Sequence, residues 1–282
     1  MDFITGKLIQ FNSKELNLHG FLSYSNNKKI IIHVHGMGGD FFRFPLTWEL
    51  AKQSKKMGYD LFLINTRGYG LISKIWGKKK KTLGTAHEKF EDCLIDIDSA
   101  IKNVLKLGYK EIILSGHSTG CQKITFYQSK KQNKKVKGLI LLSPADDFNL
   151  EKKRINSKKH LKIAKKMLKN GKGNEIMPKK ISNYNAKRFL SFADPKNIEA
   201  QLFNYEGKLI LFSKIKCPII AIFGEKDYFA KQKAEECLNI LKSKTNSKYF
   251  ETKIIPKAEH NYKGQEKITV KKIIKFLKNL KK

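Results

Sequence analysis

The sequence predicts the α/β class, with a mostly parallel central sheet flanked by helices and a helical cap inserted late in the chain. Apolar runs of strand length alternate with segments of helical periodicity along most of the sequence. Most of these runs are apolar throughout, as in strands that are covered on both faces. Glycine-rich turns directly follow two of them, at residues 36–39 and 116–120.

Length and composition fit a single domain with an insertion. The chain has 282 residues, of which 40% are hydrophobic, so it can bury a sizeable core. No apolar stretch has the length of a signal peptide or a membrane span, so we expect no secretion and no membrane insertion. The cysteines form no Cys-x-x-Cys pair and have no histidine at metal-ligand spacing, which favours reduced thiols in the cytoplasm over zinc or disulfides. They are Cys93, Cys121, Cys217 and Cys237.

The net charge of +33 would attract nucleic acid, anionic headgroups or acidic substrates. However, lysine is spread along nearly the whole chain, and only residues 78–81 form a block. A compositional bias and an anion-binding role both explain this pattern. Because no nucleic-acid motif accompanies the charge, we expect no specific nucleic-acid partner.

The N-terminal region predicts two antiparallel edge strands and a first parallel strand. Residues 7–11 and 16–24 read as the strand pair, with a turn at Asn12 and Ser13. Residues 29–35 are a β-branched run that ends at the glycine loop.

A helix, a strand and a second helix follow. Residues 45–57 predict the first helix, and residues 60–65 predict a strand buried on both faces. Thr85 and Glu88 stand at the positions of a capping box, in which both side chains bind free backbone amides at a helix start. We therefore expect the second helix to begin there and to end at Gly108, with one apolar stripe along it.

The remaining strands and helices repeat this alternation. A strand at 111–115 leads into a helix to about residue 129, and a last helix starts at Gln265. Further buried strands are expected at residues 138–143, 218–224 and 249–255.

Residues 144–213 interrupt the alternation. This segment is rich in lysine and contains one clear helix, at 157–170, but no convincing core strand. Ligands of such sheets bind beyond the carboxyl ends of the strands. We expect residues 144–213 to form a helical cap over that edge, with residues 1–143 and 214–282 as the core.

The strongest chemical signal is Gly-x-Ser-x-Gly at residues 116–120, between a predicted strand and a predicted helix. The two glycines allow a turn so tight that Ser118 stands at its apex. There its hydroxyl faces the cleft, and the helix N-terminus favours the negative charge that develops during attack. The motif in this setting predicts that Ser118 is a nucleophile.

A serine nucleophile needs a histidine as base and a carboxylate that orients the histidine. Of the seven histidines, only His260 follows the last predicted core strand. Asp227 follows the strand at 218–224 and is our first choice for the acid. Glu225 and Asp146 are the alternatives.

The tetrahedral intermediate requires two N–H donors for its oxyanion. We expect one from Thr119, directly after the nucleophile, and one from Met37 in the glycine loop, with Gly38 as the alternative. His33 and His35 precede this loop, and we interpret His33 as a buried core residue and His35 as a residue that shapes the loop. His117 is expected to pack against the turn of Ser118.

These motifs resemble the α/β-hydrolase superfamily over nearly the whole chain except the cap. The resemblance rests on the HGMGG loop at residues 35–39, the GHSTG turn, the Gly224–Asp227 loop and the pair Glu259-His260. Residues 65–70, NTRGYG, look like the D-x-R-G-x-G loop of esterase and lipase branches, with Asn in place of Asp. Residues 84–97 together with the HGM sequence also resemble a branch that includes fungal siderophore-ester hydrolases. The resemblance implies ester cleavage without fixing the substrate.

The sequence thus predicts a serine hydrolase with Ser118, Asp227 and His260 as its triad. We expect it to act on a small ester-like substrate, and the basic residues of the cap favour an anionic one. Thioester or amide cleavage would use the same residues. No metal or organic cofactor is required, and the oligomeric state stays open. The alternative function is a non-catalytic scaffold that binds RNA or an acidic partner through its basic surface.

Overall fold

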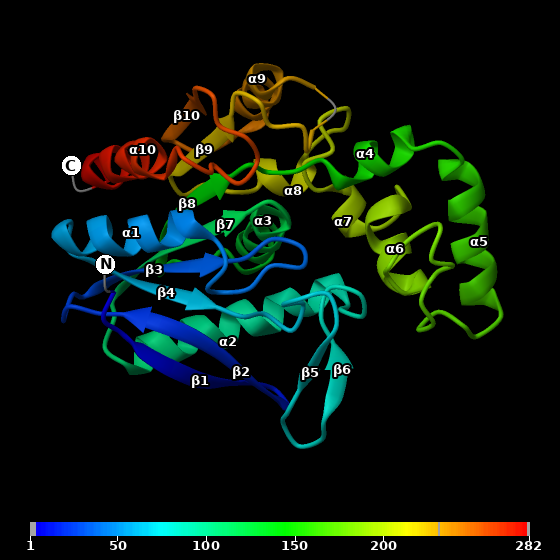
Figure 1. The fold of residues 1–282 in the computed structure, drawn as a ribbon. Helices are drawn as coiled ribbons and strands as arrows, with labels where there is room; N and C mark the ends of the chain where they lie inside the picture. The colour runs from blue at the N-terminus through cyan, green and yellow to red at the C-terminus, as the bar shows by residue number, and fades with distance from the viewer. Residues whose placement is uncertain (1–3, 231, 281–282) are drawn as a thin grey trace.

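The computed structural model describes residues 4–230 and 232–280. Its central sheet has eight strands in the order β1-β2-β4-β3-β7-β8-β9-β10 (Figure 1). β1 pairs with β2 and β2 with β4 in antiparallel fashion, and every other pairing in this sheet is parallel. The predicted mostly parallel sheet is therefore confirmed. The strands are β1 (Lys7–Ser13), β2 (Leu16–Ser23), β3 (Lys29–Val34), β4 (Tyr59–Ile64), β7 (Glu111–His117), β8 (Val136–Leu142), β9 (Ile219–Gly224) and β10 (Phe250–Ile255).

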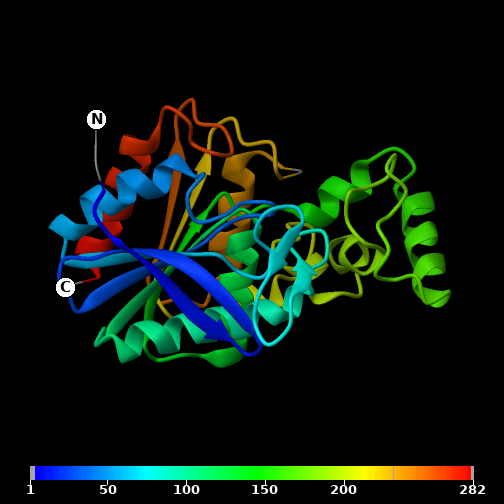
Figure 2. The same cartoon turned by 60° about the horizontal axis from the view of Figure 1, so that its bottom comes forward.

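Helices cover both faces of the sheet (Figures 1 and 2). One face packs against α1 and α10, and the other against α2, α3 and α9. Successive residues of a strand point to opposite faces, so Ile30 and Ile32 join one core and Ile31 the other. This explains why the central strands are apolar throughout. The helices are α1 (Pro45–Lys56), α2 (Cys93–Lys106), α3 (Thr119–Lys131), α9 (Ala234–Lys244) and α10 (Glu266–Asn279).

The parallel strands end at one edge of the sheet. Val34 of β3 pairs with Gly116 of β7, and Leu142 of β8 pairs with Ile222 of β9. The loops that follow these strands and β10 therefore lie together, although they are far apart in the sequence.

Residues 144–213, predicted as the cap and called the cap segment below, lie between β8 and β9. The helices within residues 147–201 project from the sheet on the right of Figure 1, whereas Phe203, Tyr205 and Phe212 join one core of the sheet. Phe189 and Leu190 centre an apolar cluster of this segment that is separate from both faces of the sheet. The helix predicted at 157–170 is confirmed as α5, whereas α6 was not predicted. The helices here are α4 (Asp147–Lys153), α5 (Ser157–Lys169), α6 (Ala186–Ala193), α7 (Ile198–Gln201) and α8 (Ile210–Ser213).

The predicted capping box is wrong. The helix begins at Cys93, after a single 3-10 turn at Phe90–Asp92. The Thr85 hydroxyl instead donates to the Gly68 carbonyl at 2.7 Å, and Glu88 is buried in an ion pair with Lys123. Both side chains bind groups that are distant in the chain, so neither of them caps the start of a helix.

Two smaller differences concern local turns. β1 continues to Ser13, whose hydroxyl donates to Asp96 at 2.6 Å, so the turn falls at Lys14 with φ of 55°. A hairpin of two three-residue strands, β5 (Ser73–Ile75) and β6 (Lys81–Leu83), was not predicted because such short strands carry little periodicity. Within the described ranges, no helix is long and apolar enough to cross a membrane.

Candidate active site

Ser118 stands between β7 and α3 in a strained turn, with φ of 54° and ψ of −124°. The flanking glycines are required by close approach. A Cβ on Gly116 would lie 2.5 Å from the Gly120 carbonyl, and a Cβ on Gly120 would lie 2.2 Å from the Val34 carbonyl oxygen. The Ser118 N–H donates to the Leu142 carbonyl at 2.9 Å, which ties the turn to the neighbouring strand.

His260 and Asp227 form a hydrogen-bonded pair from the loops after β10 and β9. The ring Nδ1 lies 3.0 and 3.1 Å from the two carboxylate oxygens of Asp227. The Phe229 ring stacks on the imidazole with centroids 4.0 Å apart, and the His117 ring packs against it at 4.8 Å. With Nδ1 donating to the carboxylate, Nε2 is the nitrogen that can accept a proton.

The electrostatics of this pair favour an ionised Asp227. Burial by itself would raise the pKa of the carboxyl group, but hydrogen bonds and charge, those of His260 first, together lower the pKa below its ordinary value. The Phe229 N–H also donates to Asp227 at 2.9 Å. The carboxylate can therefore orient the imidazole and stabilise its protonated form.

The two alternative acids make other contacts. Glu225 accepts the Lys257 N–H at 2.7 Å. Asp146 caps α4 by accepting the Asn149 N–H at 3.0 Å. Among the hydrogen bonds of the described residues, Asp227 alone joins a carboxylate to the His260 ring.

Ser118 and His260 line one cavity of about 570 Å³, together with Met37 and Asp147. No hydrogen bond among the described residues uses the Ser118 hydroxyl. A hydrogen bond between a nucleophile and its base is often long until substrate is in place. The structure thus brings the predicted nucleophile and base to one cavity, with only the acid–base contact formed.

The glycine loop passes directly beside Ser118, since a Cβ on Gly36 would lie 3.0 Å from the Ser118 Cβ. The Gly38 N–H is occupied, because it donates to the Thr85 hydroxyl at 2.7 Å. Met37 N–H donates to no acceptor in the part of the chain that the structure describes. Thr119 is the first residue of α3, where an N–H has no helical carbonyl to bind. This geometry favours Met37 over Gly38 as an oxyanion donor.

His35 holds the glycine loop in place. Its Nδ1 donates to the Gly36 carbonyl at 2.8 Å, and its Nε2 accepts the Thr66 N–H at 3.1 Å. Burial, with a smaller effect from the Lys123 charge, lowers the pKa of His35 to about 4, so the ring is neutral near pH 7. This agrees with the prediction that His35 shapes the loop.

The other two neighbouring histidines are also buried. His33 Nδ1 lies 3.0 Å from the Ser115 hydroxyl, and burial lowers the pKa of His33 to about 3. His117 Nε2 lies 3.0 Å from the His260 carbonyl, and burial lowers its pKa far below the ordinary value. His33 is buried as predicted for a core residue, and His117, next to Ser118 in the chain, lines the cavity of Ser118.

The loop that resembles D-x-R-G-x-G, at residues 65–70, is held by hydrogen bonds and ion pairs of Asn65 and Arg67. Asn65 Oδ1 accepts the Phe41 N–H at 2.9 Å, a bond that an aspartate could also accept. The Arg67 guanidinium binds Asp96 at 2.8 Å and Asp92 at 2.6 Å. The loop is thereby fixed to helix α2 and the turn before it.

A buried ionic cluster that the sequence analysis missed joins the core to the cap segment. Lys123 of α3 lies 2.7 Å from Glu88, and Arg188 of α6 lies 3.6 Å from the other oxygen of Glu88 and contacts Glu199. Lys123 and Arg188 are each only 1% exposed. Burial would raise the pKa of Glu88, but the charges of Lys123 and Arg188 lower it. Charged residues in a lysine-rich sequence give no signal of such burial.

Asp147 and Tyr184 also line the cavity of Ser118 and were not predicted. Asp147 accepts from Thr119 Oγ1 at 3.3 Å and from Gln122 Nε2 at 3.0 Å. It is the first residue of α4 and the neighbour of Asp146, the alternative acid of the sequence analysis, and this position is the signal that the sequence offers. Tyr184 comes from an irregular loop of the cap segment, where no pattern marks it.

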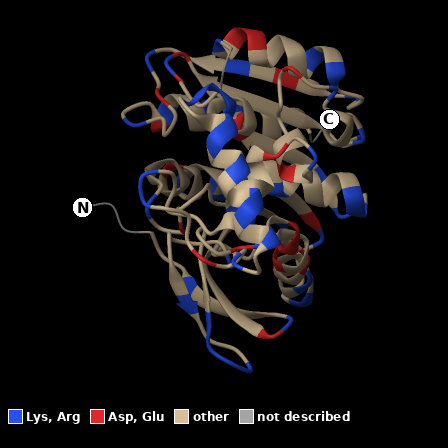
Figure 3. Ribbon diagram, turned by 90° about the vertical axis from the view of Figure 1, so that its right-hand side faces the viewer, with Lys and Arg blue, Asp and Glu red and all other residues tan. Residues whose placement is uncertain are grey.

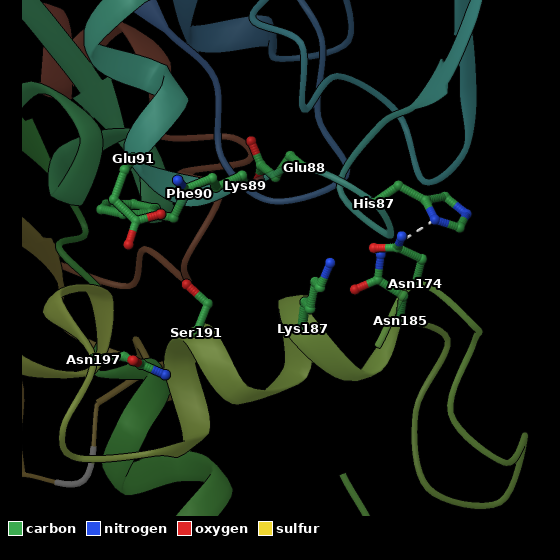
Figure 4. Close-up of a pocket in the computed structure, with 10 residues that line it drawn as sticks. All are labelled: His87, Glu88, Lys89, Phe90, Glu91, Asn174, Asn185, Lys187, Ser191 and Asn197. Atoms are coloured by element: carbon green, nitrogen blue, oxygen red, sulfur yellow. Dashed lines mark hydrogen bonds between the residues drawn. The ribbon is translucent and has the colours of Figure 1, made fainter. Parts of the chain in front are cut away.

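A separate polar cavity of about 340 Å³ lies between residues 87–91 and α6 (Figure 4). His87, predicted at a helix start, lies here instead, with its Nδ1 3.3 Å from Asn185 Nδ2. Lys187 projects from α6 towards Glu88 and Lys89. This cavity shares no lining residue with the cavity of Ser118.

A family model described as "Protein of unknown function (DUF1749)" matches residues 2–278. No curated protein matches the chain in sequence.

Several solved structures are similar to this chain along nearly its whole length. The siderophore hydrolase EstB from Aspergillus fumigatus is 17% identical with a TM-score of 0.73, covering 99% of this chain and 98% of its own. Est1E from Butyrivibrio proteoclasticus, solved with ferulic acid, is 15% identical with a TM-score of 0.71, covering 96% and 98%. The Pyrococcus furiosus esterase Pf2001 is 19% identical with a TM-score of 0.65, covering 98% and 91%. At these identities the likeness concerns the fold.

Proposed function

We propose that this chain, which belongs to the DUF1749 family and has the α/β-hydrolase fold, is a serine hydrolase that cleaves carboxylic esters. One observation carries the proposal. A strained, glycine-flanked Ser118 and a carboxylate-paired His260 line the same cavity. Thioesters and amides are cleaved by the same chemistry and are the neighbouring substrate classes.

In the proposed mechanism, His260 Nε2 takes the hydroxyl proton while Ser118 Oγ bonds to the ester carbonyl carbon. The oxyanion accepts hydrogen bonds from the Met37 and Thr119 N–H groups. The ester C–O bond then breaks, and His260 returns the proton to the leaving alcohol. Water, activated by the same ring, hydrolyses the acyl-enzyme and restores the serine.

Asp227 has two roles in this mechanism. Its hydrogen bond to Nδ1 leaves Nε2 as the nitrogen without a proton, which is the form that can act as a base. Its negative charge then stabilises the imidazolium that forms. Because its pKa is lowered, the carboxylate stays ionised as the pH falls below neutral.

We further propose that residues 144–213 act as the cap of this site. Asp147 and Tyr184, both from this segment, contribute to the wall of the catalytic cavity. The ionic cluster around Arg188 joins the cap segment to the core.

The test is hydrolysis of p-nitrophenyl butyrate by the purified chain and by Ser118→Ala. We expect wild-type turnover and a loss of about 10³-fold or more in kcat in the variant, as for removal of the nucleophile in other triads. Ser129→Ala is a matched control, because Ser129 is a buried serine of α3, the helix that follows Ser118, and does not line the cavity. Equal turnover by Ser118→Ala and wild type would refute the proposal.

A further inference from the structure

A second cavity, of about 330 Å³, adjoins the catalytic cavity. Tyr184 lines both, so the two share part of one wall. The rest of the second cavity is built by Leu71, by Arg154 after α4 and by residues 179–183 before α6. Most of its wall therefore belongs to the cap segment.

This second cavity is basic. Arg154, Lys179 and Lys180 line it, and no carboxylate does. Lys179 and Lys180 form no ion pair with any described residue. Arg154 is partly neutralised by Glu151 at 2.9 Å, so the two lysines supply the uncompensated charge. We call this the basic cavity.

The catalytic cavity has a different charge balance. Asp40 and Asp147 line it beside Arg43 and Lys263, and Asp40 is already paired with Arg43. An anionic group beside Ser118 would meet the Asp147 carboxyl group. The same group in the basic cavity would meet cations only.

The wall of the basic cavity also includes apolar residues. Leu71 and Ile181 line the basic cavity beside the Tyr184 ring. Such a wall suits methylene groups of a substrate that reaches from one cavity into the other. Figure 3 shows that Lys and Arg recur along the helices of the cap segment, and α5 has no acidic residue.

We propose that the basic cavity is a subsite for a carboxylate at the far end of the ester substrate. Lys179 and Lys180 donate charge-assisted hydrogen bonds to that carboxylate. The apolar part of the substrate passes Tyr184, and the ester carbonyl lies at Ser118. This inference rests on the proposed function and names the substrate class of the same site.

The test compares esters that differ only in the charge of the far end. Mono-p-nitrophenyl esters of succinic, adipic, suberic and sebacic acid carry the carboxylate, and their methyl-capped counterparts do not. Acetyl esters of ω-hydroxy acids, with matching methyl-capped forms, place the charge on the alcohol side. We expect at least one chain length to show about 10-fold higher kcat/KM for the anionic form, and this preference to fall as salt is added.

Two double variants with the same net charge test whether the preference for anionic esters depends on the basic cavity. Lys179→Gln/Lys180→Gln is expected to remove the preference and to leave turnover of the capped esters unchanged. The control Lys134→Gln/Lys135→Gln changes two exposed lysines in the loop before β8, at the opposite edge of the sheet. This control is expected to keep the preference for anionic esters. The inference is overturned if no anionic ester is preferred, or if both double variants lose the preference equally.

A binding arm separates failure of this inference from failure of the proposed function. Ser118→Ala is titrated calorimetrically with monomethyl suberate and with dimethyl suberate, with and without the Lys179→Gln/Lys180→Gln change. Selective binding of the monoester that needs both lysines supports the subsite even if no ester is hydrolysed. Absence of that selectivity overturns the subsite even if capped esters are hydrolysed well.

Discussion

Ser118 adopts a backbone conformation that few residues with a side chain adopt, and its neighbours explain how it is maintained. Gly116 and Gly120 permit contacts that any Cβ would block, and the Leu142 carbonyl binds the Ser118 N–H. Backbone strain of this kind is retained where surrounding contacts fix it, often at functional sites. In this protein the strained residue is also the predicted nucleophile.

Thr85 gives a test of the glycine loop at the level of one residue. Its hydroxyl accepts the Gly38 N–H and donates to the Gly68 carbonyl, both at 2.7 Å, and so positions the loop that carries Met37. We predict that Thr85→Val lowers kcat about 10-fold with little change in KM, because an oxyanion donor is displaced. Steady-state kinetics measure this, and Thr85→Ser should restore kcat. A folded Thr85→Val protein with wild-type kcat would show that this contact does not position the donor.

His33 and His35 predict how stability depends on pH. Burial lowers their folded-state pKa values to about 3 and about 4, so as the pH falls the unfolded chain binds protons first. Stability should therefore be lost between about pH 6.5 and pH 4. At pH 5, which is about 1.5 units below the ordinary histidine pKa, we expect the free energy of unfolding to fall by roughly 2 kcal/mol for each ring.

Urea unfolding at about pH 7.5 and pH 5 measures this effect. The His33→Asn variant should lose about 2 kcal/mol less than the wild type between the two conditions, whatever its stability at the higher pH. An identical pH dependence in the two proteins would contradict the burial of a neutral ring at this position.

At the scale of elements, the connection of α6 to α3 is carried by the ionic cluster around Arg188. We predict that Arg188→Met destabilises the protein by about 3 to 5 kcal/mol, because Glu88 and Glu199 lose a buried cation. Lys165→Met is the control, since it removes the half-exposed Lys165 from its pair with Asp194 in the same segment and should cost at most about 1 kcal/mol. Urea titration measures the free energies of unfolding of the two variants and of the wild type. Equal losses in the two variants would mean that the cluster holds the cap no more tightly than a surface pair.

The elements also show where sequence patterns succeed and where they fail. The parallel strands were predictable because both faces of each one are covered, as Ile30, Ile31 and Ile32 illustrate. The start of α2 was mispredicted because Thr85 and Glu88 fit the local pattern of a capping box. In the structure, Thr85 binds Gly68 and Glu88 binds Lys123 instead. Local patterns do not reveal partners that are distant in the chain.

At the scale of the whole molecule, the sheet brings together loops that are separated by more than a hundred residues. His260 and Ser118 line one cavity because β10 and β7 are parallel strands that end at one edge of the sheet. Chain order and the expectation of parallel strands were enough to predict that Ser118, Asp227 and His260 lie at that edge. The wall formed by the cap was not predictable, because Tyr184 and the basic cavity lie on irregular chain without periodicity.

Labelling with a fluorophosphonate, followed by mass spectrometry of the intact chain and of its peptides, tests the central claim most directly. The reagent forms a covalent bond only with an activated serine, so the account predicts one adduct per chain, on the peptide that contains Ser118. Labelling should be lost in Ser118→Ala and strongly slowed in His260→Ala. A folded wild-type chain that stays unlabelled, or an adduct on another serine, would contradict the account.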